Sequence, residues 1–173
     1  MKNDALISIH ETIYRSLRLR IMFGELEPGE MFSIRGLGKE YSVSMTPIRD
    51  ATRRLVAEGA LVMSTSGRIS VPTINLVRIR ELFRVRLLLE PELAVRSIAR
   101  VHSALIERLV EKARFIEKVV RADNAAEYVK ANIEFLRMLY LRAQSPGIFS
   151  LVKTVWLQSG PTLKIVSNNN LSS

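Results

Sequence analysis

Apolar residues recur at helical spacing over two neighbouring stretches near the start of the chain. The first stretch has apolar positions at Ile13, Leu17, Ile21 and Met22. Gly24 ends this pattern, and residues 26–29 include a proline and a glycine that turn the chain. Ser33 is a suitable N-cap for a second, shorter helix. The apolar positions of that helix are Ile34, Leu37 and Tyr41. The pattern predicts two helices separated by a turn.

A third helix is predicted up to residue 57, with signals at both ends. Thr46 can act as its N-cap, Pro47 suits the first helical position, and Gly59 suits the left-handed residue beyond the last turn. One face is apolar, with Ile48, Ala51, Leu55 and Val56. The opposite face is polar, with Thr46, Arg49, Asp50, Arg53 and Arg54. Such a face is suited to DNA, because guanidinium groups match guanine edges and phosphate oxygens.

Two short strands are expected after this helix. Residues 61–64 and 68–71 are rich in apolar and β-branched side chains and flank the turn formed by Thr65, Ser66 and Gly67. Pro72 then closes the second strand. A helix-turn-helix followed by such a hairpin, or wing, is a winged helix-turn-helix, which we assign to residues 1–72.

The remaining residues, 73–173, have the apolar spacing of long helices. We expect helices over residues 74–100, 103–122, 125–143 and 147–160. The apolar positions include Leu82, Val85, Leu89, Leu93 and Ile98 in the first of these helices, and Leu105, Leu109, Ala113, Ile116 and Val120 in the second. A further helix begins after Pro161, but residues 167–173 have no apolar period and are expected to be disordered. The fold class is therefore mainly α, a winged helix-turn-helix followed by an all-α bundle.

The first seventy residues resemble the GntR family of bacterial transcription regulators. The matching residues are Gly24, Leu26, Pro28, Gly29, Leu37, Val43, Ser44, Thr46, Pro47, Ile48, Arg49, Asp50, Ala51, Leu55, Glu58 and Gly59. In that family the winged helix binds an operator as a dimer. The resemblance implies that Arg35 and Arg49 contact DNA, that Ser44 and Thr46 touch the backbone or bases, and that the wing at Gly67 enters the minor groove.

Resemblance and placement together predict a set of DNA-contacting residues. They are Arg35, Ser44, Met45, Thr46, Arg49, Arg53, Thr65, Ser66, Gly67 and Arg68. Met45 departs from the family pattern, because many relatives have an arginine there and a thioether cannot donate to a base edge or neutralise a phosphate. Either the operator differs from those of such relatives or binding is weaker.

The second region resembles the FCD effector domain of FadR-type regulators. The matching residues are Arg86, Glu90, Asn132, Phe135, Leu139, Tyr140, Ser145, Pro146, Trp156 and Pro161. In many FCD domains an Asp or Asn four residues before a His begins a metal site. Asn132 matches the first ligand, but Leu136 replaces the histidine and cannot coordinate a metal. We therefore expect no metal and no cofactor.

The bundle is expected to be incomplete at its C-terminus, because the later helices of FCD domains have no counterpart in the sequence. Two explanations remain open: a truncated or frameshifted end, or a natural variant that covers the exposed faces by dimerisation. Arg86 also has two interpretations. It forms an ion pair with Glu90 on a solvated face, or, as the resemblance implies, it binds a small carboxylate effector together with Asn132.

Net charge adds less than its size suggests. The chain of 173 residues has a formal charge of +9. Residues 1–73 contain ten Lys/Arg against eight Asp/Glu, whereas residues 74–173 contain sixteen against nine. The argument for DNA binding therefore depends on where the arginines lie, near the predicted groove surface, and not on the total.

Other chemistry finds little support in the sequence. The chain has no cysteine, and its two histidines, His10 and His102, lie in different predicted domains. No nucleophile elbow, metal pair or phosphate loop is present, so an enzyme is not expected. No apolar stretch approaches the length of a membrane span and the start is polar, which predicts a cytoplasmic bacterial protein without membrane partners.

The favoured function is a transcription regulator that binds a palindromic operator in double-stranded DNA as a homodimer. In intact relatives, the resemblance implies, the helical domain senses a small carboxylate metabolite. The alternative is a degenerate, truncated relative that acts as a dimerisation partner without binding DNA. Met45 and the missing helices support the alternative, while Arg35 and Arg49 oppose it.

Overall fold

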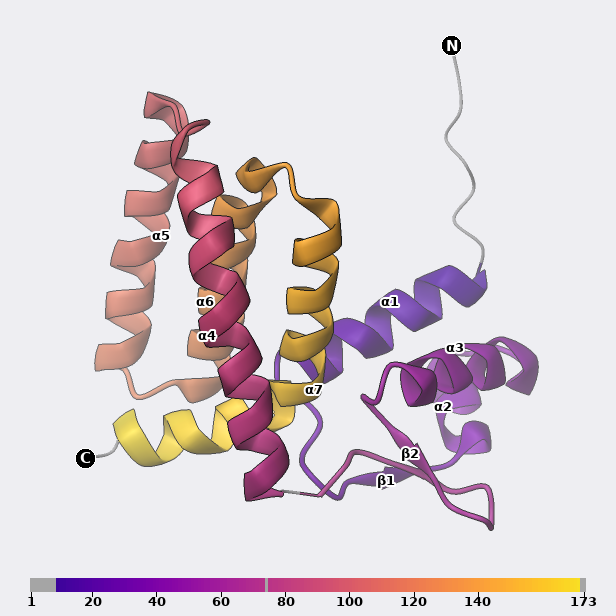
Figure 1. The fold of residues 1–173 in the computed structure, drawn as a ribbon. Helices are drawn as coiled ribbons and strands as arrows, with labels where there is room; N and C mark the ends of the chain where they lie inside the picture. Colours follow the sequence, from indigo (N-terminus) through magenta and orange to yellow (C-terminus); the bar gives the residue numbers. More distant parts are fainter. Residues whose placement is uncertain (1–8, 74, 172–173) are drawn as a thin grey trace.

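The N-terminal lobe places three helices against a small sheet (Figure 1). The computed structural model describes residues 9–73 and 75–171. The lobe consists of α1 (Ile9–Met22), β1 (Met31–Phe32), α2 (Ile34–Glu40), α3 (Met45–Ala57), β2 (Val62–Met63) and β3 (Ile69–Ser70). The buried apolar residues of α1 and α3, among them Leu17, Ile21, Ile48 and Leu55, are those expected from helical spacing.

The predicted ends of α2 and α3 are confirmed at two positions. The Ser33 hydroxyl accepts a hydrogen bond from the Gly36 N–H at 2.9 Å and so caps α2. Gly59 has a φ of 68°, the left-handed conformation in which a side chain is strained. It follows the C-cap Glu58 of α3 and closes the helix.

The start of α3 differs from the prediction. Its N-cap is Ser44, and the helix already includes Met45 and Thr46. Pro47 is therefore the third helical residue and not the first. The position costs nothing, because the first four N–H groups of any helix lack an intrahelical acceptor. Proline and threonine are compatible with several places in a first turn, so neither determines which residue begins it.

The wing is smaller than expected and has an additional strand. β2 and β3 pair antiparallel over two residues each, with Val62 opposite Ser70 and Met63 opposite Ile69. The other edge of β3 pairs with β1, where Met31 lies opposite Ser70. The sheet order is β1-β3-β2. A strand of two residues is too short to show an alternation of apolar and polar side chains, and its partner strand lies far along the sequence. β1 was therefore not predicted from the sequence.

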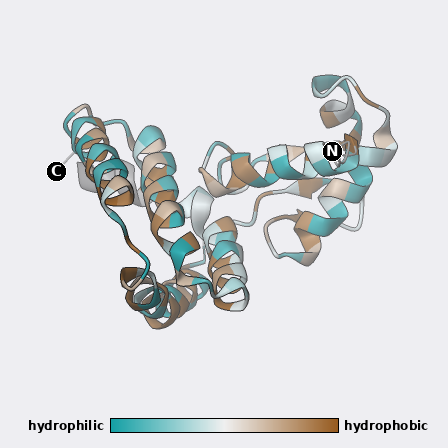
Figure 2. Cartoon of the chain, turned by 90° about the horizontal axis from the view of Figure 1, so that it is seen from above, coloured by the Kyte–Doolittle hydropathy of each residue, from teal (hydrophilic) through white to brown (hydrophobic). Residues whose placement is uncertain are grey.

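The second lobe is a helical bundle beside the first lobe (Figures 1 and 2). It consists of α4 (Leu76–Ile98), α5 (Ser103–Arg121), α6 (Ala125–Tyr140), the 3₁₀ turn η1 (Leu141–Ala143) and α7 (Pro146–Leu171). α4, α5 and α6 match the predicted segments 74–100, 103–122 and 125–143 closely. Ile98 and Val120 are exposed, contrary to their assignment as inward apolar positions. The residues just before them, Ser97 and Val119, are buried instead, so the buried face at the end of each helix lies one residue earlier than the apolar spacing indicated.

The end of the chain differs most from expectation. α7 continues through Pro161 to Leu171, where a break and a disordered tail were predicted. In Figure 1 the yellow C-terminal part of α7 runs across the foot of the bundle, in a different direction from the orange part. A proline removes one helical hydrogen bond and bends a helix. The helix nevertheless continues, with Trp156 and Leu157 buried before the proline and Leu163 packed against the core after it.

One hydrophobic core extends through both lobes. Leu17 and Ile21 of α1 belong to the same buried cluster as Val152, Trp156 and Leu157 of α7. Gly160 permits the closest approach, since a Cβ there would lie 2.4 Å from the carbonyl oxygens of Ile21 and Met22. The orientation of the N-terminal lobe against the bundle therefore depends on backbone contact at α7.

Candidate nucleic-acid interface

The residues predicted to contact DNA all lie on the surface of the N-terminal lobe. Arg35 is on α2, Arg49 and Arg53 are on the outer face of α3, and Arg68 follows the turn of the wing; each of them is exposed. The other predicted residues are also exposed: Ser44, Met45, Thr46, Thr65, Ser66 and Gly67. Their contact with DNA stays a prediction, but the fold leaves every one of these side chains accessible to a duplex.

The four arginines share a second property. Within residues 9–73 and 75–171, no hydrogen bond or ion pair is recorded for the side chain of Arg35, Arg49, Arg53 or Arg68. We call these four residues the free arginines. A guanidinium group without a protein partner keeps all its donors for a phosphate or a base edge.

Arg54 behaves differently from the free arginines, although the sequence placed it near the groove surface. Its guanidinium carbon lies 3.6 Å from the centre of the Tyr14 ring, and Nη1 donates to Glu11 Oε2 at 2.8 Å. The hydrogen bond from Arg54, with a second from Arg15, holds the pKa of Glu11 below its ordinary value. Arg54 therefore connects α3 to α1 and is not one of the free arginines.

The entrance of α3 combines exposure with a loosely held cap. Ser44 is the N-cap residue, but its hydroxyl makes no capping hydrogen bond. The first N–H groups of α3 therefore have no side-chain acceptor from Ser44, and Ser44, Met45 and Thr46 are all exposed. The N-terminus of a helix favours a phosphate oxygen. Met45 is exposed at this entrance and adds no donor.

The wing turn is held by its own hydrogen bonds. Gly67 has a φ of 78°, and its N–H donates to the Ser64 carbonyl at 2.9 Å. The Ser64 N–H donates to the Arg68 carbonyl at 2.9 Å, and the Ser64 and Ser66 hydroxyls lie 2.9 Å apart. A Cβ at Gly67 would meet no atom within 4 Å. Backbone conformation, not crowding, explains the glycine here.

Arg86, the predicted effector residue, lies in an ion pair inside the bundle. Its Nε donates to Glu90 Oε1 at 2.6 Å, and the two side chains are only 15% and 12% exposed. Glu90 also accepts from the Trp156 indole at 2.9 Å and from the Tyr140 hydroxyl at 3.1 Å. Burial and the negative charge of Glu90 raise the pKa of Tyr140 above its ordinary value of 10.0.

Glu90 is thus the centre of a polar cluster joining α4, α6 and α7. The sequence interpretation of an Arg86–Glu90 ion pair is confirmed, but the pair lies inside the bundle and not on a solvated face. The role of Glu90 as acceptor for Tyr140 and Trp156 was missed, since those residues lie 50 and 66 positions away. Asn132 is half-buried on α6, and nothing in the described part of the chain joins it to Arg86. The effector site formed by Arg86 and Asn132 stays a prediction.

Residues 9–73 and 75–171 contain neither a metal-binding cluster nor a membrane-spanning helix. Between residues 9 and 171, leaving out residue 74, no three His, Cys, Asp or Glu side chains cluster in a way that could hold a metal ion. None of the helices in the same range has the length and apolar character needed to cross a bilayer.

Comparison with known families accounts for both lobes. Residues 9–71 match the family described as bacterial regulatory proteins, gntR family. Residues 81–171, more than half of the chain, match the FCD domain. The chain belongs to the GntR family and has an FCD domain. Both resemblances drawn from the sequence are confirmed, and with them a class of transcription regulators that are not enzymes.

Individual relatives of this GntR-family chain agree with the assignment. It is 25% identical over 160 residues to the HTH-type transcriptional regulator McbR of Escherichia coli K12, covering 91% of this chain and 71% of McbR. It is also 25% identical over 148 residues to the gluconate operon transcriptional repressor of Bacillus subtilis, covering 86% and 59% of the two chains. The chain therefore spans only part of the length of these relatives.

Solved structures show the same fold as this GntR-family chain. The structure of E. coli McbR/YncC superposes with a TM-score of 0.87 at 22% identity, covering 93% of this chain and 76% of that one. A GntR transcriptional regulator from Rhodococcus sp. RHA1 superposes with a TM-score of 0.74 at 17% identity, covering 94% and 81%. The predicted fold class, a winged helix-turn-helix followed by a helical bundle, is confirmed.

Proposed function

We propose that the chain regulates transcription by binding a palindromic operator as a homodimer, with α3 in the major groove and the wing on the adjacent minor groove. The observation that carries this proposal is the set of free arginines around the outer face of α3. Other arginines of the same lobe, such as Arg18, Arg20 and Arg54, have acidic partners, so the unpaired ones are concentrated where a helix-turn-helix meets DNA.

A duplex library with a randomised core provides a direct test. Sequences enriched by the full chain should share an inverted repeat, and the enriched duplex should bind more tightly than a scrambled version of itself. Affinity should fall by several orders of magnitude between about 50 and about 200 mM salt if six or more phosphates are contacted. Failure to enrich any sequence at low salt would reject operator binding and favour the alternative of a dimerisation partner.

Arg49→Ala should weaken binding to the enriched duplex by about 1–3 kcal/mol and relax the preference at one base pair, because a bidentate donor is lost. Arg54→Ala is the matched control: it removes the same charge from the same helix, but from a side chain already engaged by Glu11 and Tyr14. Fluorescence anisotropy with both variants checks this. If the two variants lose the same binding free energy, only the total charge of the protein determines its affinity for DNA.

The homodimer is supported by an uncovered apolar face on α4. Leu87, Leu88, Val95 and Ile98 are 74%, 69%, 64% and 69% exposed. We call these four residues the α4 stripe. They recur at helical spacing on one long helix, where a solvated face would be polar. Two copies of the chain would both cover the stripe and carry two α3 helices to one palindrome.

A small carboxylate effector at Arg86 would have to share the guanidinium with Glu90. Glu90 already occupies Nε of Arg86. An effector carboxylate would therefore bind the two terminal nitrogens of the guanidinium or displace Glu90. The second route would also release Trp156 and Tyr140, and so would loosen α7, the helix that packs on α1.

A further inference from the structure

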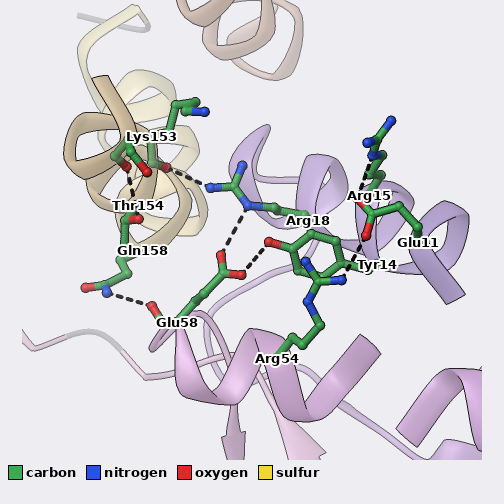
Figure 3. A network of polar contacts seen from close by, with 10 residues as sticks. Glu11, Tyr14, Arg15, Arg18, Arg54, Glu58, Lys153, Thr154 and Gln158 are labelled. Atoms are coloured by element: carbon green, nitrogen blue, oxygen red, sulfur yellow. Dashed lines mark hydrogen bonds and ion pairs between the residues drawn. The ribbon is translucent and has the colours of Figure 1, made fainter. Parts of the chain in front are cut away.

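The C-terminal end of α3 is held by side chains of the second lobe. Gln158 of α7 donates from Nε2 to the Glu58 carbonyl oxygen at 2.7 Å. Arg78 of α4 donates from Nη2 to the Gly59 carbonyl oxygen at 3.1 Å and to Gln158 Oε1 at 3.1 Å. We call these three hydrogen bonds the α3 clamp. The contact of Gln158 with Glu58 is drawn in Figure 3.

The side chain of Glu58 extends the same connection to α1. Its carboxylate accepts from the Tyr14 hydroxyl and, at 3.2 Å, from Arg18 Nε. Arg18 also reaches the Lys153 carbonyl of α7 at 3.4 Å (Figure 3). The last turn of α3 is thus joined to α7 both directly, through Gln158, and indirectly, through Arg18.

Gly59 provides an independent sign that the clamp is closely packed. A Cβ at this position would lie 3.0 Å from Gln158 Nε2 and 3.1 Å from Arg78 Nη2. The Glu58-Gly59 pair is part of the family motif, and its glycine is explained locally by a positive φ. The structure adds a second reason: the two clamp side chains occupy the space that a side chain at residue 59 would need.

The donors of the clamp suit their position. The last carbonyl groups of a helix have no intrahelical donor and carry a partial negative charge. Gln158 satisfies the carbonyl of the C-cap Glu58, and Arg78 binds the carbonyl of Gly59, the residue just beyond the helix; both donors come from the other lobe. The direction of α3 is therefore set relative to α4 and α7, and not only by contacts inside the helix-turn-helix.

We propose that Arg78 and Gln158 are positioning residues for DNA recognition: by capping the C-terminus of α3, they fix the angle at which the bundle presents the reading face. This inference rests on the proposed function. In a dimer, two α3 helices must meet two half-sites at a set separation, so the angle determines which spacing is accepted. Arg78 and Gln158 touch no DNA themselves; they act through α3.

The first test compares three full-length variants. Gln158→Glu keeps the shape of the side chain but replaces the donor facing the Glu58 carbonyl with an acceptor. Arg78→Gln removes the guanidinium group. Arg80→Gln is the control, since Arg80 is an exposed arginine on the same helix, two residues away, and takes no part in the clamp. The probes are the enriched palindrome, the same palindrome with one base pair added between half-sites, and a single half-site.

We expect Gln158→Glu and Arg78→Gln to bind the single half-site about as tightly as the wild type and to lose about tenfold, or 1.4 kcal/mol, of the preference for the correct spacing. Arg80→Gln should keep that preference. A purely structural role would change stability without changing the spacing preference. If both clamp variants retain the wild-type preference, the positioning role is refuted.

A second measurement needs no DNA and separates failure of this inference from failure of the proposed function. The chain has no cysteine, so spin labels can be attached at Lys39→Cys on α2 and Glu107→Cys on α5, both exposed helical positions. Pulsed electron–electron double resonance measures the distance between the two spin labels and so reports the placement of one lobe against the other. Diluting the labelled protein with unlabelled protein removes distances between labels on different chains. The clamp variants should broaden the distance distribution, and Arg80→Gln should not.

An unchanged distribution in both clamp variants would overturn the clamp, whatever the DNA result. Wild-type protein that selects no duplex would reject the proposed function, while the distance measurement still decides whether Arg78 and Gln158 fix α3. If Gln158→Glu loses its helical circular dichroism, Arg78→Gln decides the question, because its side chain lies at the surface and leaves no buried cavity.

Discussion

Two adjacent arginines of α3 have different roles because of one aromatic ring. Arg53 and Arg54 follow each other in sequence, and both are exposed. Successive residues of a helix point about 100° apart, so only one of them faces Tyr14 of α1. That one, Arg54, stacks on the ring and pairs with Glu11, while Arg53 keeps its donors for a partner outside the lobe.

Gly160→Ala should destabilise the fold by about 1–3 kcal/mol, because the new Cβ would overlap the backbone of Ile21 and Met22, which cannot rotate away. Gly147→Ala is the matched control in the same helix, where a Cβ meets nothing within 4 Å. It should be neutral or stabilising by up to about 1 kcal/mol. Urea unfolding measures both, and equal values would show that α7 does not approach α1 so closely.

In the N-terminal lobe, the N-cap residues of α2 and α3 differ in how much they stabilise their helices. Ser33 closes a hydrogen bond to the third residue of α2, whereas the Ser44 hydroxyl leaves the first N–H groups of α3 without a side-chain acceptor. A reading helix with open N–H groups can offer them to DNA, at some cost to its own stability.

Ser33→Ala should therefore lower the free energy of unfolding by about 1 kcal/mol, the usual effect of removing an N-cap. Ser44→Ala should change it by less than about 0.5 kcal/mol, but should weaken DNA binding if its hydroxyl meets a phosphate. Denaturant titration and anisotropy on the two variants separate these effects. If Ser44→Ala lowers the free energy of unfolding more than Ser33→Ala does, the Ser44 hydroxyl caps α3 in solution.

At the junction of α4, α6 and α7, the raised pKa of Tyr140 makes stability depend on alkaline pH. The folded protein holds the Tyr140 proton more strongly than the unfolded chain does. This contribution is fully present below pH 10 and is lost as pH rises through the folded-state pKa. Tyr140→Phe should remove up to about 1.4 kcal/mol per pH unit from the decline in unfolding free energy above pH 10. Urea unfolding of the wild type and of Tyr140→Phe measures this. If both lose unfolding free energy equally above pH 10, the contact between Tyr140 and Glu90 is contradicted.

At the scale of the whole molecule, the two lobes behave as one packed unit, and the α4 stripe is an apolar face that this unit leaves uncovered. The core is continuous from α1 to α7, and the α3 clamp adds polar contacts across the same boundary. The division between residues 72 and 73 stays a prediction about domains. Signals from the bundle would reach α3 through α7 and α4, because both helices touch the end of the reading helix.

Leu87→Glu should convert the proposed dimer to a monomer, because the interface would bury a carboxylate at the most exposed residue of the α4 stripe. Its effect on the monomer should stay within about 0.5 kcal/mol, since the side chain is 74% exposed there. Leu151→Glu makes the same chemical change at an exposed residue of α7. Sedimentation velocity distinguishes them, and a dimer that survives Leu87→Glu would place the interface elsewhere.

The sequence by itself determined the features that depend on neighbouring residues. The cap at Ser33, the left-handed Gly59, the extents of α4 to α6 and the exposed placement of Arg35 and Arg49 all follow from signals within a few positions of one another. Local periodicity and capping are properties of short segments, and so they can be recognised without knowing the fold. The family motif extends this to a class of function.

The tertiary structure alone decided the features that depend on distant partners. β1 exists because β3 offers it an edge, and α7 continues past Pro161 with Leu163 packed against the core. Arg54 is not one of the free arginines because it stacks on Tyr14, and the end of α3 is held by Arg78 and Gln158. Each of these features depends on backbone or side-chain groups that meet across long sequence separations. The free energy of such contacts is gained only when the whole chain is packed.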